Sequence, residues 1–407
     1  MTGSAAANGH PFSASSSATG YLYQFRYALL EALRRMRQEN DFQVHIETLD
    51  DVVFDTQGAP PELLQTKHHI KQPADLTDAS VDLWKTLRIW CEGIAVGSLR
   101  QGSRFILVTT AAAGSGSAAE MLRPGSTRNV LGALDRLRST AATSANQTNA
   151  PAYAAFGALD AATQLQLLNN VTIIDSASSI TSLDADIRQE VFYAVDRHFL
   201  DAFLTRLEGW WHRRVIQHLA SEDRVPILST ELLDEINNLR ESLREDNLPI
   251  DDDIEELEVD ATGYSHRVFV HQLRLIQISK ARVVRAIRDY YRAFVQRSRW
   301  VREELIGVGD LDRYSARLKD AWQAHFLIMR DELGESAAEE EMRSAATNLY
   351  KWIETGELPR IRPLCQDGFV ARGSFHILAD DMKVGWHPEF EVRLRHLLEP
   401  VAEEMRQ

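Results

Sequence analysis

Hydrophobic and polar positions divide this 407-residue chain into a part with short alternating runs and a part with helical periodicity. Up to about residue 175, runs with period-two alternation or β-branched residues are separated by stretches where apolar residues recur every three or four positions. From Ala185 onward, helical spacing dominates. The pattern therefore predicts an α/β N-terminal domain, with a central mixed sheet flanked by helices, and a mostly α-helical C-terminal domain. The expected strands are 43–47, 51–55, 63–67, 104–110 and 171–175.

The expected helices begin after a tail of small residues at 1–18. Thr19 and Gly20 are positioned to cap a first helix, and a second helix is expected over 79–98 with Trp84 and Trp90 in the core. Further on, Trp210 and Trp211 are expected to seal an interdomain or partner surface. Helical spacing also predicts one long amphipathic helix with a basic face over 266–306, and further helices over 310–355.

Three other stretches indicate the domain boundary, a linker and the last elements of the C-terminal domain. The polar sequence at 221–226 marks the boundary, so we expect an N-terminal domain over 19–220 and a C-terminal domain over 226–407. The acidic stretch 247–256 lacks the spacing and the glycine of an EF-hand, which favours a solvated linker. Glycine and His-Pro signals in Arg372–Pro388 favour a small irregular or β element before a last helix.

The most informative stretch is the predicted hairpin formed by 51–55 and 63–67. The connection Thr56–Pro61 is rich in turn residues and too short for a crossover, so the strands should pair antiparallel. Period two places Gln65 and Lys67 on one face of the second strand. Asp51, at the start of the first strand, then lies opposite them, and the strand 43–47 delivers Glu47 to the same corner.

This corner has the chemistry of a divalent-cation site. Mg²⁺ takes oxygen ligands from one or two carboxylates, with water and substrate phosphate completing the shell. Glu47 and Asp51 supply the charge and the Gln65 amide supplies a neutral oxygen, while Lys67 is placed to orient or activate an attacking water. The alternative is structural: acidic residues that cap a turn, and an ordinary strand lysine.

Auxiliary candidates surround the corner. Gln24, in the first turn of the first helix, either packs and caps or reaches the metal corner, and Asp50 precedes Asp51. His68 and His69 point to opposite faces if the strand continues, so one ion does not readily bind both. We expect His68 to contact phosphate or solvent.

Composition narrows the function classes. A hydrophobic content of 44% and a charged content of 26% are typical of a globular protein. Two distant cysteines exclude a disulfide framework and a cysteine-based zinc site, and no apolar stretch reaches the length of a membrane helix, so a cytoplasmic protein is expected. The net charge of −14 restricts DNA binding to local basic patches and suggests that oligomerisation or a partner completes a positive channel.

Two motifs together resemble a known family. Gly20-Tyr21-Leu-Tyr23-Gln24, Glu47-x-x-Asp50-Asp51 and Gln65-x-Lys67-His68 resemble, in that order, the PD-(D/E)xK-type double-stranded DNA endonucleases of bacterial anti-phage defence. These effectors occur beside CD-NTases and as the nuclease subunit of Lamassu and related ABC-three-component systems. The stretches 372–380 and 384–388 are similar to the C-terminal module of those systems. Position 65 departs from the acidic residue common in the superfamily, although Gln-x-Lys is a variant among such nucleases.

The resemblance implies a restriction-endonuclease-like fold and hydrolysis of double-stranded DNA with Mg²⁺, or Mn²⁺ in its place. Glu47, Asp51 and Gln65 would be metal ligands and Lys67 the catalytic lysine. The implied partners are an SMC-like ATPase subunit and a small third subunit, with activity released by self-association. The alternative is a nuclease-fold subunit without activity, which serves as a scaffold that binds DNA or the ATPase.

Overall fold

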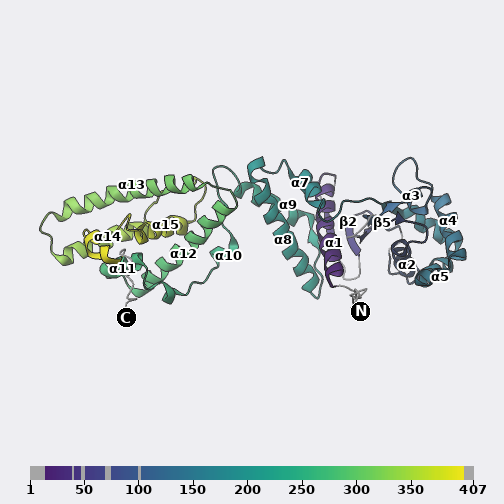
Figure 1. Ribbon diagram of the computed structural model, residues 1–407, viewed down its shortest axis with the longest axis horizontal. Coiled ribbons are helices and arrows are strands. Elements are labelled where there is room, and N and C mark those ends of the chain that lie inside the picture. The colour runs from purple at the N-terminus through teal and green to yellow at the C-terminus, as the bar shows by residue number, and fades with distance from the viewer. Residues whose placement is uncertain (1–13, 39–40, 47–50, 69–74, 100–101, 398–407) are drawn as a thin grey trace, which may run out of the picture. The chain divides into compact units, whose positions relative to one another are not determined.

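The computed structural model describes residues 14–38, 41–46, 51–68, 75–99 and 102–397; of residues 14–17 and of Asp51 it describes the backbone alone (Figure 1). The chain divides into two compact units. Unit 1 comprises residues up to 194 together with 204–237, and unit 2 comprises 195–203 together with 238 onward. In the described ranges, no helix has both the length and the apolar character that a membrane crossing requires.

A six-stranded mixed sheet organises unit 1. Its strand order is β7-β5-β3-β2-β1-β8, with β1, β2 and β3 antiparallel, β8 antiparallel to β1, and β5 and β7 parallel to β3. The mixed sheet predicted from the sequence is therefore confirmed. The strands are β1 (Phe42–Ile46), β2 (Asp51–Thr56), β3 (Glu62–Lys67), β5 (Arg104–Thr109), β7 (Val171–Ile174) and β8 (Ile227–Leu228), and a separate parallel pair consists of β4 (Asp75–Leu76) and β6 (Ala112–Ala113).

The predicted hairpin is present with the predicted register. β2 and β3 pair antiparallel, and Asp51 lies opposite Gln65 across the two strands. Gly58 in the connecting turn has a φ of +82°, a conformation that a residue with a side chain adopts only with strain. The turn chemistry at 56–61 therefore fixes which residues of β2 and β3 meet.

Helices cover both faces of this sheet. Figure 1 shows α1 on one side of the strands and α2 on the other. Trp84 and Trp90 of α2 are fully buried in the hydrophobic core, as predicted. The helices are α1 (Ala14–Arg35), α2 (Val81–Ala95), α3 (Ala118–Met121), α4 (Val130–Thr143), α5 (Ala150–Ala158), α6 (Ala161–Asn170), α7 (Leu183–Val191), α8 (Leu200–Ala220) and α9 (Ser229–Ser242).

Unit 1 differs from the sequence-based expectation in three places. α1 begins at Ala14, so part of the predicted 1–18 tail is helical. Trp211 does not seal an interdomain surface: it is fully buried, and its indole N–H donates to the Phe25 carbonyl at 2.8 Å. The chain divides after Asn237 rather than at 221–226, because β8 pairs with β1 and thereby draws the start of α9 into unit 1.

Unit 2 is helical, in agreement with the helical C-terminal region predicted. The single helix expected over 266–306 is two helices, because Gln277 adopts a positive φ of 57° between them. The expected linker at 247–256 is ordered against α12: Asp251 accepts from the Gln296 amide at 2.8 Å and Ile254 is buried. The helices are α10 (Asp252–Glu255), α11 (Val268–Leu275), α12 (Lys280–Arg302), α13 (Val308–Leu333), α14 (Glu339–Thr355), α15 (Gly368–Asp380) and α16 (Phe390–Leu394).

The Arg372–Pro388 motif begins as a helix, which corrects the prediction of an irregular or β element. Its glycine marks a close helix crossing rather than a turn, because a Cβ at Gly373 would lie 2.0 Å from the Asp289 carbonyl oxygen of α12. Arg372 donates to the Asp289 carboxylate at 2.6 Å, and Arg297 of α12 donates to the Ser374 hydroxyl at 3.3 Å. The first half of the motif therefore joins α15 to α12.

His376 and the second half of the motif also pack inside unit 2. The His376 ring lies 5.4 Å from the Phe269 ring and 6.3 Å from the Trp386 ring, and burial lowers its pKa to about 4, so it is neutral at pH 7. The Gly385 carbonyl accepts from the Trp322 indole at 2.8 Å. These contacts place His376 and Trp386 inside unit 2, where the buried His376 Nδ1 and Trp386 Nε1 atoms have no hydrogen-bond partner among the described residues.

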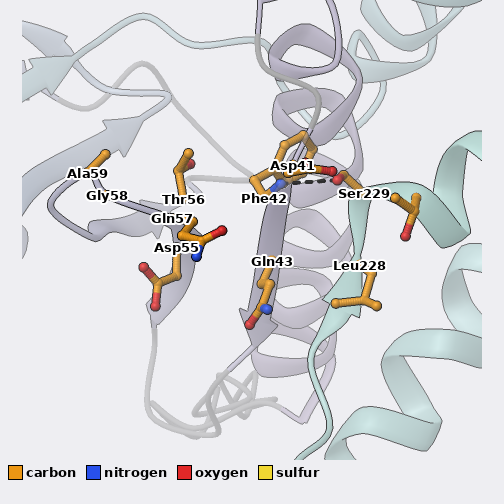
Figure 2. A pocket seen from close by; sticks show the side chains of 11 residues that line it. Asp41, Phe42, Gln43, Asp55, Thr56, Gln57, Gly58, Ala59, Leu228 and Ser229 are labelled. Carbon is orange, nitrogen blue, oxygen red and sulfur yellow. Dashed lines mark hydrogen bonds between the residues drawn. The ribbon is translucent and has the colours of Figure 1, made fainter.

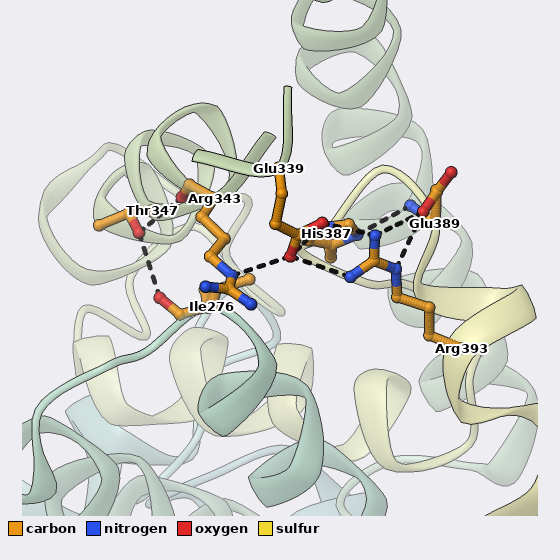
Figure 3. A network of polar contacts seen from close by, with 7 residues as sticks. All are labelled: Ile276, Glu339, Arg343, Thr347, His387, Glu389 and Arg393. Carbon is orange, nitrogen blue, oxygen red and sulfur yellow. Dashed lines mark hydrogen bonds and ion pairs between the residues drawn. The ribbon is translucent and has the colours of Figure 1, made fainter. Parts of the chain in front are cut away.

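A polar network ties the end of the motif to α14 and α16. Figure 3 shows Glu339, at the start of α14, between Arg343, His387 and Arg393. Arg393 donates to both Glu339 oxygens, at 2.9 and 2.6 Å, and the hydrogen bonds from Arg393 hold the pKa of that carboxyl below its usual range. His387 lies 3.8 Å from Glu339. The network fixes the loop that follows α15 against two helices.

The α12–α15 crossing gives a first prediction. Gly373→Ala is expected to destabilise unit 2 by about 1–3 kcal/mol, because the methyl group forces the two helix backbones apart. Gly309→Ala in α13 is the control, because its Cβ would meet no atom closer than 3.7 Å and alanine is favoured in a helix. Urea unfolding of both variants measures the difference. Equal stabilities would contradict the close crossing.

Candidate active site

The C-terminal end of β3 brings together two of the predicted site residues. By strand alternation Gln65 and Lys67 share one face of the sheet, and the backbone of Asp51 lies opposite Gln65. The same face carries Leu63, which belongs to the core cluster under α2. The predicted β2–β3 register, which sets Asp51 opposite Gln65, is therefore confirmed.

Gln65 is the most unusual polar residue of this region. Its side chain is 0% exposed, and among the described residues neither its amide oxygen nor its amide nitrogen has a hydrogen-bond partner. Leaving such a group buried and unpaired costs about 1–3 kcal/mol. A site for a ligand is one physical reason to retain it, because a bound group would satisfy the amide.

Lys67 is held by the backbone at the strand end. Its carbonyl oxygen accepts from the Thr110 N–H at 3.2 Å, and its side chain is half-buried. The parallel register places Lys67 beside Thr109 of β5, whose side chain is fully buried and accepts from the Ala111 N–H at 3.1 Å. The lysine thus starts from a fixed backbone position at the carboxyl ends of two parallel strands.

Thr109 is a neighbour of the site that the sequence argument did not single out. Strand topology could have predicted this neighbour, because the carboxyl ends of parallel strands meet at one edge of a sheet. That prediction required knowing that β5 pairs with β3 rather than elsewhere.

α1 lies against the opposite face of β3. Arg35 of α1 pairs with Glu62, and the Tyr23 ring lies 4.6 Å from the His68 ring. His68 is half-buried, and its Nε2 accepts from the Ile180 N–H at 3.2 Å, so its predicted contact with phosphate or solvent stays a prediction. Its position one residue beyond Lys67 explains why it faces α1 instead of the Gln65 side.

Gln24 lies on the same helix as Tyr23 and is 3% exposed. In the described part of the chain its amide nitrogen has no hydrogen-bond partner, and no hydrogen bond joins it to Gln65 or Lys67. Both interpretations of Gln24, packing and reaching the corner, therefore stay open as predictions.

The remaining predicted residues lie at the edge of what the structure describes. Glu47 and Asp50 fall outside the described residues, and of Asp51 the side chain is not described. Within the described ranges no three His, Cys, Asp or Glu side chains form a metal-binding group. The carboxylate part of the proposed ligand set therefore stays a prediction, while the unpartnered amide of Gln65 fits an oxygen-preferring cation.

Three other reactive groups of the sequence, one carboxyl and two thiols, serve structure. Asp175 is partly buried, yet hydrogen bonds from Arg123 and from the Ala113 N–H, at 2.7 Å, hold its pKa below the usual range. Burial raises the pKa of the Cys91 and Cys365 thiols to about 12, so both are protonated at neutral pH. Neither thiol is suited to act as a nucleophile.

A separate open cavity of about 620 Å³ lies at the other end of β2 (Figure 2). Asp41 and Asp55 contribute carboxylates to it, while Ser229 of α9 accepts from the Phe42 N–H at 3.0 Å. Among the described residues that line this cavity there is no lysine or arginine. A phosphate backbone is disfavoured there by like charge, so the β3 end remains the candidate active site.

Comparisons with known proteins bear on unit 2. Residues 269–394 match the sequence model of C-terminal domain 7 of the ABC-three component (ABC-3C) systems. This range contains the stretches 372–380 and 384–388, so the predicted similarity of the C-terminal region to these systems is confirmed. The match does not reach β2 and β3, and the nuclease assignment stays a prediction.

The remaining comparisons are distant. No curated protein matches the chain. The Cap4 SAVED/CARF-domain containing receptor of Acinetobacter baumannii, solved with the cyclic trinucleotide 3′3′3′-cAAA, is 13% identical with a TM-score of 0.32, over 55% of this chain and 48% of that one. The Cap4 receptor of Moraxella osloensis is 14% identical with a TM-score of 0.35, over 63% and 59%. The match spans less than two thirds of either receptor.

Gln65 gives a stability prediction with a matched control. Gln65→Leu is expected to stabilise unit 1 by about 1–3 kcal/mol, because it removes an unpaired buried amide. Gln164→Leu is expected to destabilise it by a similar amount, because that buried amide accepts from Arg138 at 2.8 Å and donates to the Phe156 carbonyl at 2.8 Å.

Thermal unfolding of the two glutamine variants, without added metal, tests this contrast. A loss of stability in Gln65→Leu equal to that in Gln164→Leu would show that Gln65 is a structural residue.

Proposed function

We propose that this chain is a metal-dependent double-stranded DNA endonuclease and the effector subunit of a defence complex of the ABC-three-component type. The observation that carries the proposal is the β2–β3 register, which sets Gln65, with its buried unpartnered amide, and Lys67 on one face opposite Asp51. The mixed sheet flanked by helices is the architecture that the resemblance to PD-(D/E)xK nucleases implies. The match of residues 269–394 supports the defence system.

In this proposal one set of residues holds the metal ion, and Lys67 positions the attacking water. The Gln65 amide oxygen and the carboxylates of Asp51 and Glu47 would hold Mg²⁺, which would supply positive charge at the scissile phosphate and a Lewis acid for the attacking water. Lys67, fixed at the strand end, orients the attacking water and stabilises negative charge on the phosphate oxygens. Water oxygen forms the new P–O bond, the P–O bond to the sugar breaks, and the leaving oxygen takes up a proton.

The resemblance also implies partner subunits and a way in which the activity is released. We infer an SMC-like ATPase and a small third subunit as partners, with cutting released when protomers self-associate and place two or more sites on one DNA. Unit 2 would then carry docking and assembly. The rival function is a scaffold in which the nuclease fold is retained without catalysis, and only an activity measurement separates the two.

Plasmid cleavage tests this function. Purified protein, over a concentration series with Mg²⁺ or with EDTA, is expected to cut linear and supercoiled plasmid only with the metal. Lys67→Ala is expected to reduce the rate by about 10²–10⁴-fold, because general acid–base and charge stabilisation by the lysine are lost. Lys319→Ala, at an exposed position of α13, is the control and is expected to cut normally.

The dependence on protein concentration tests the assembly step. A rate that rises more steeply than linearly indicates that cutting requires self-association. Metal-dependent cutting that is equally fast in Lys67→Ala would contradict the assigned site. If the wild type does not cut even when its partner subunits are added, the scaffold alternative is favoured.

A further inference from the structure

Five arginines lie along one face of α12, three over its first half and middle and two near its end. Arg285, Arg288, Arg292, Arg299 and Arg302, here called the arginine stripe, are separated by three, four, seven and three positions. With 3.6 residues per turn, this spacing keeps them on one side of the helix. At a rise of 1.5 Å per residue the stripe spans about 25 Å.

The stripe lies away from the packed side of the helix. The buried side, with Asp289 and Ala293, meets Gly373 of α15. Arg285, Arg288 and Arg302 are exposed, and in the described part of the chain none of the three has a carboxylate within ion-pair distance. Burial and the neighbouring Arg288 lower the pKa of Arg292, although Asp289 and Glu255 partly offset this, so positive charges stand side by side on this face.

The C-terminal half of the stripe contacts acidic residues of the same chain. The acidic segment 251–260 carries seven carboxylates, at 251, 252, 253, 255, 256, 258 and 260. Arg299 donates to Asp253 at 2.8 and 2.9 Å and lies 3.3 Å from Asp251. Arg292 donates to the Leu257 carbonyl at 3.0 Å. The chain therefore places a run of negative charge of its own against the C-terminal half of the stripe.

We propose that the arginine stripe binds the sugar–phosphate backbone of double-stranded DNA, with Arg285 and Arg288 as the contacts left open by the acidic segment. The proposal rests on the proposed function for the identity of the polyanion. Guanidinium groups bind phosphate oxygens in a bidentate geometry, and duplex DNA presents negative charges along its whole length. Exposed arginines without a carboxylate partner, on a chain of net charge −14, are the kind of local patch that DNA binding requires.

An acidic protein surface is the competing occupant. Stable protein interfaces have an apolar centre with charges at the rim. Here two of the three exposed members, Arg285 and Arg288, lie one turn apart on the helix. The segment that contacts the stripe does so through carboxylates and one carbonyl. Adjacent exposed positive charges with no apolar side chain between them on this face favour the phosphate backbone over a mixed protein surface.

Duplex binding by the full-length protein, measured in EDTA by fluorescence anisotropy over a range of salt concentrations, tests the proposal. The variant Arg285→Gln/Arg288→Gln is expected to bind roughly tenfold or more weakly, and the slope of log affinity against log salt is expected to fall by about 1.8, which corresponds to two phosphate contacts. The loss should be the same for duplexes of different sequence. Lys319→Gln/Arg330→Gln, at two exposed positions of α13, removes the same charge and should change neither quantity.

A third variant tests the acidic segment. Asp251→Asn/Asp253→Asn removes both carboxylates that pair with Arg299 and is expected to tighten duplex binding several-fold. Poly-L-glutamate of matched charge serves as a second probe, and tighter binding of this peptide than of duplex would assign the stripe to an acidic protein and overturn the proposal. An unchanged salt slope in the double variant, or no duplex binding by the wild type, would also overturn it. Because EDTA prevents metal-dependent cutting, these outcomes are independent of whether the β3 site hydrolyses DNA.

Discussion

The antiparallel pairing of β2 with β3 is the constraint on which the account of unit 1 depends. Because side chains alternate along a strand, a slip of one residue would move Gln65 and Lys67 to the α1 face and bring Leu64 and Thr66 to the other. The turn with Gly58 and the parallel partner β5 both fix the actual register. One pairing therefore decides which polar groups meet at the strand ends and which hydrophobic groups fill the core.

Local chemistry in the sequence was sufficient for the hairpin. Period-two alternation, a β-branched run beginning at Asp51 and a turn rich in glycine and proline are short-range signals, and they predicted the opposition of Asp51 and Gln65 correctly. Long-range packing was not available from such signals. Trp211 binds the Phe25 carbonyl across 186 positions, and β8 pairs with β1, so neither the role of the tryptophan nor the boundary of the unit could be predicted from a local pattern.

Gly373 illustrates the same limit in unit 2. A glycine beside serine in a sequence is an equally good signal for a turn and for a close helix crossing, and only the position of Asp289 on α12 decides between them. The motif 372–388 lies within the range 269–394 that matches the ABC-three-component module, and most of its described contacts are packing and a polar network. The exposed charges of this unit are therefore better candidates for a function than the packed residues of the motif.

The most direct test of the central claim is the position of the metal. Anomalous diffraction from crystals grown with Mn²⁺ and a short duplex locates the ion independently of activity. The account predicts a peak within ligand distance of the Gln65 amide oxygen and the Asp51 carboxylate, next to a DNA phosphate. Ordered strand ends with no peak there, or a peak at the cavity between Asp41 and Asp55 alone, would contradict it.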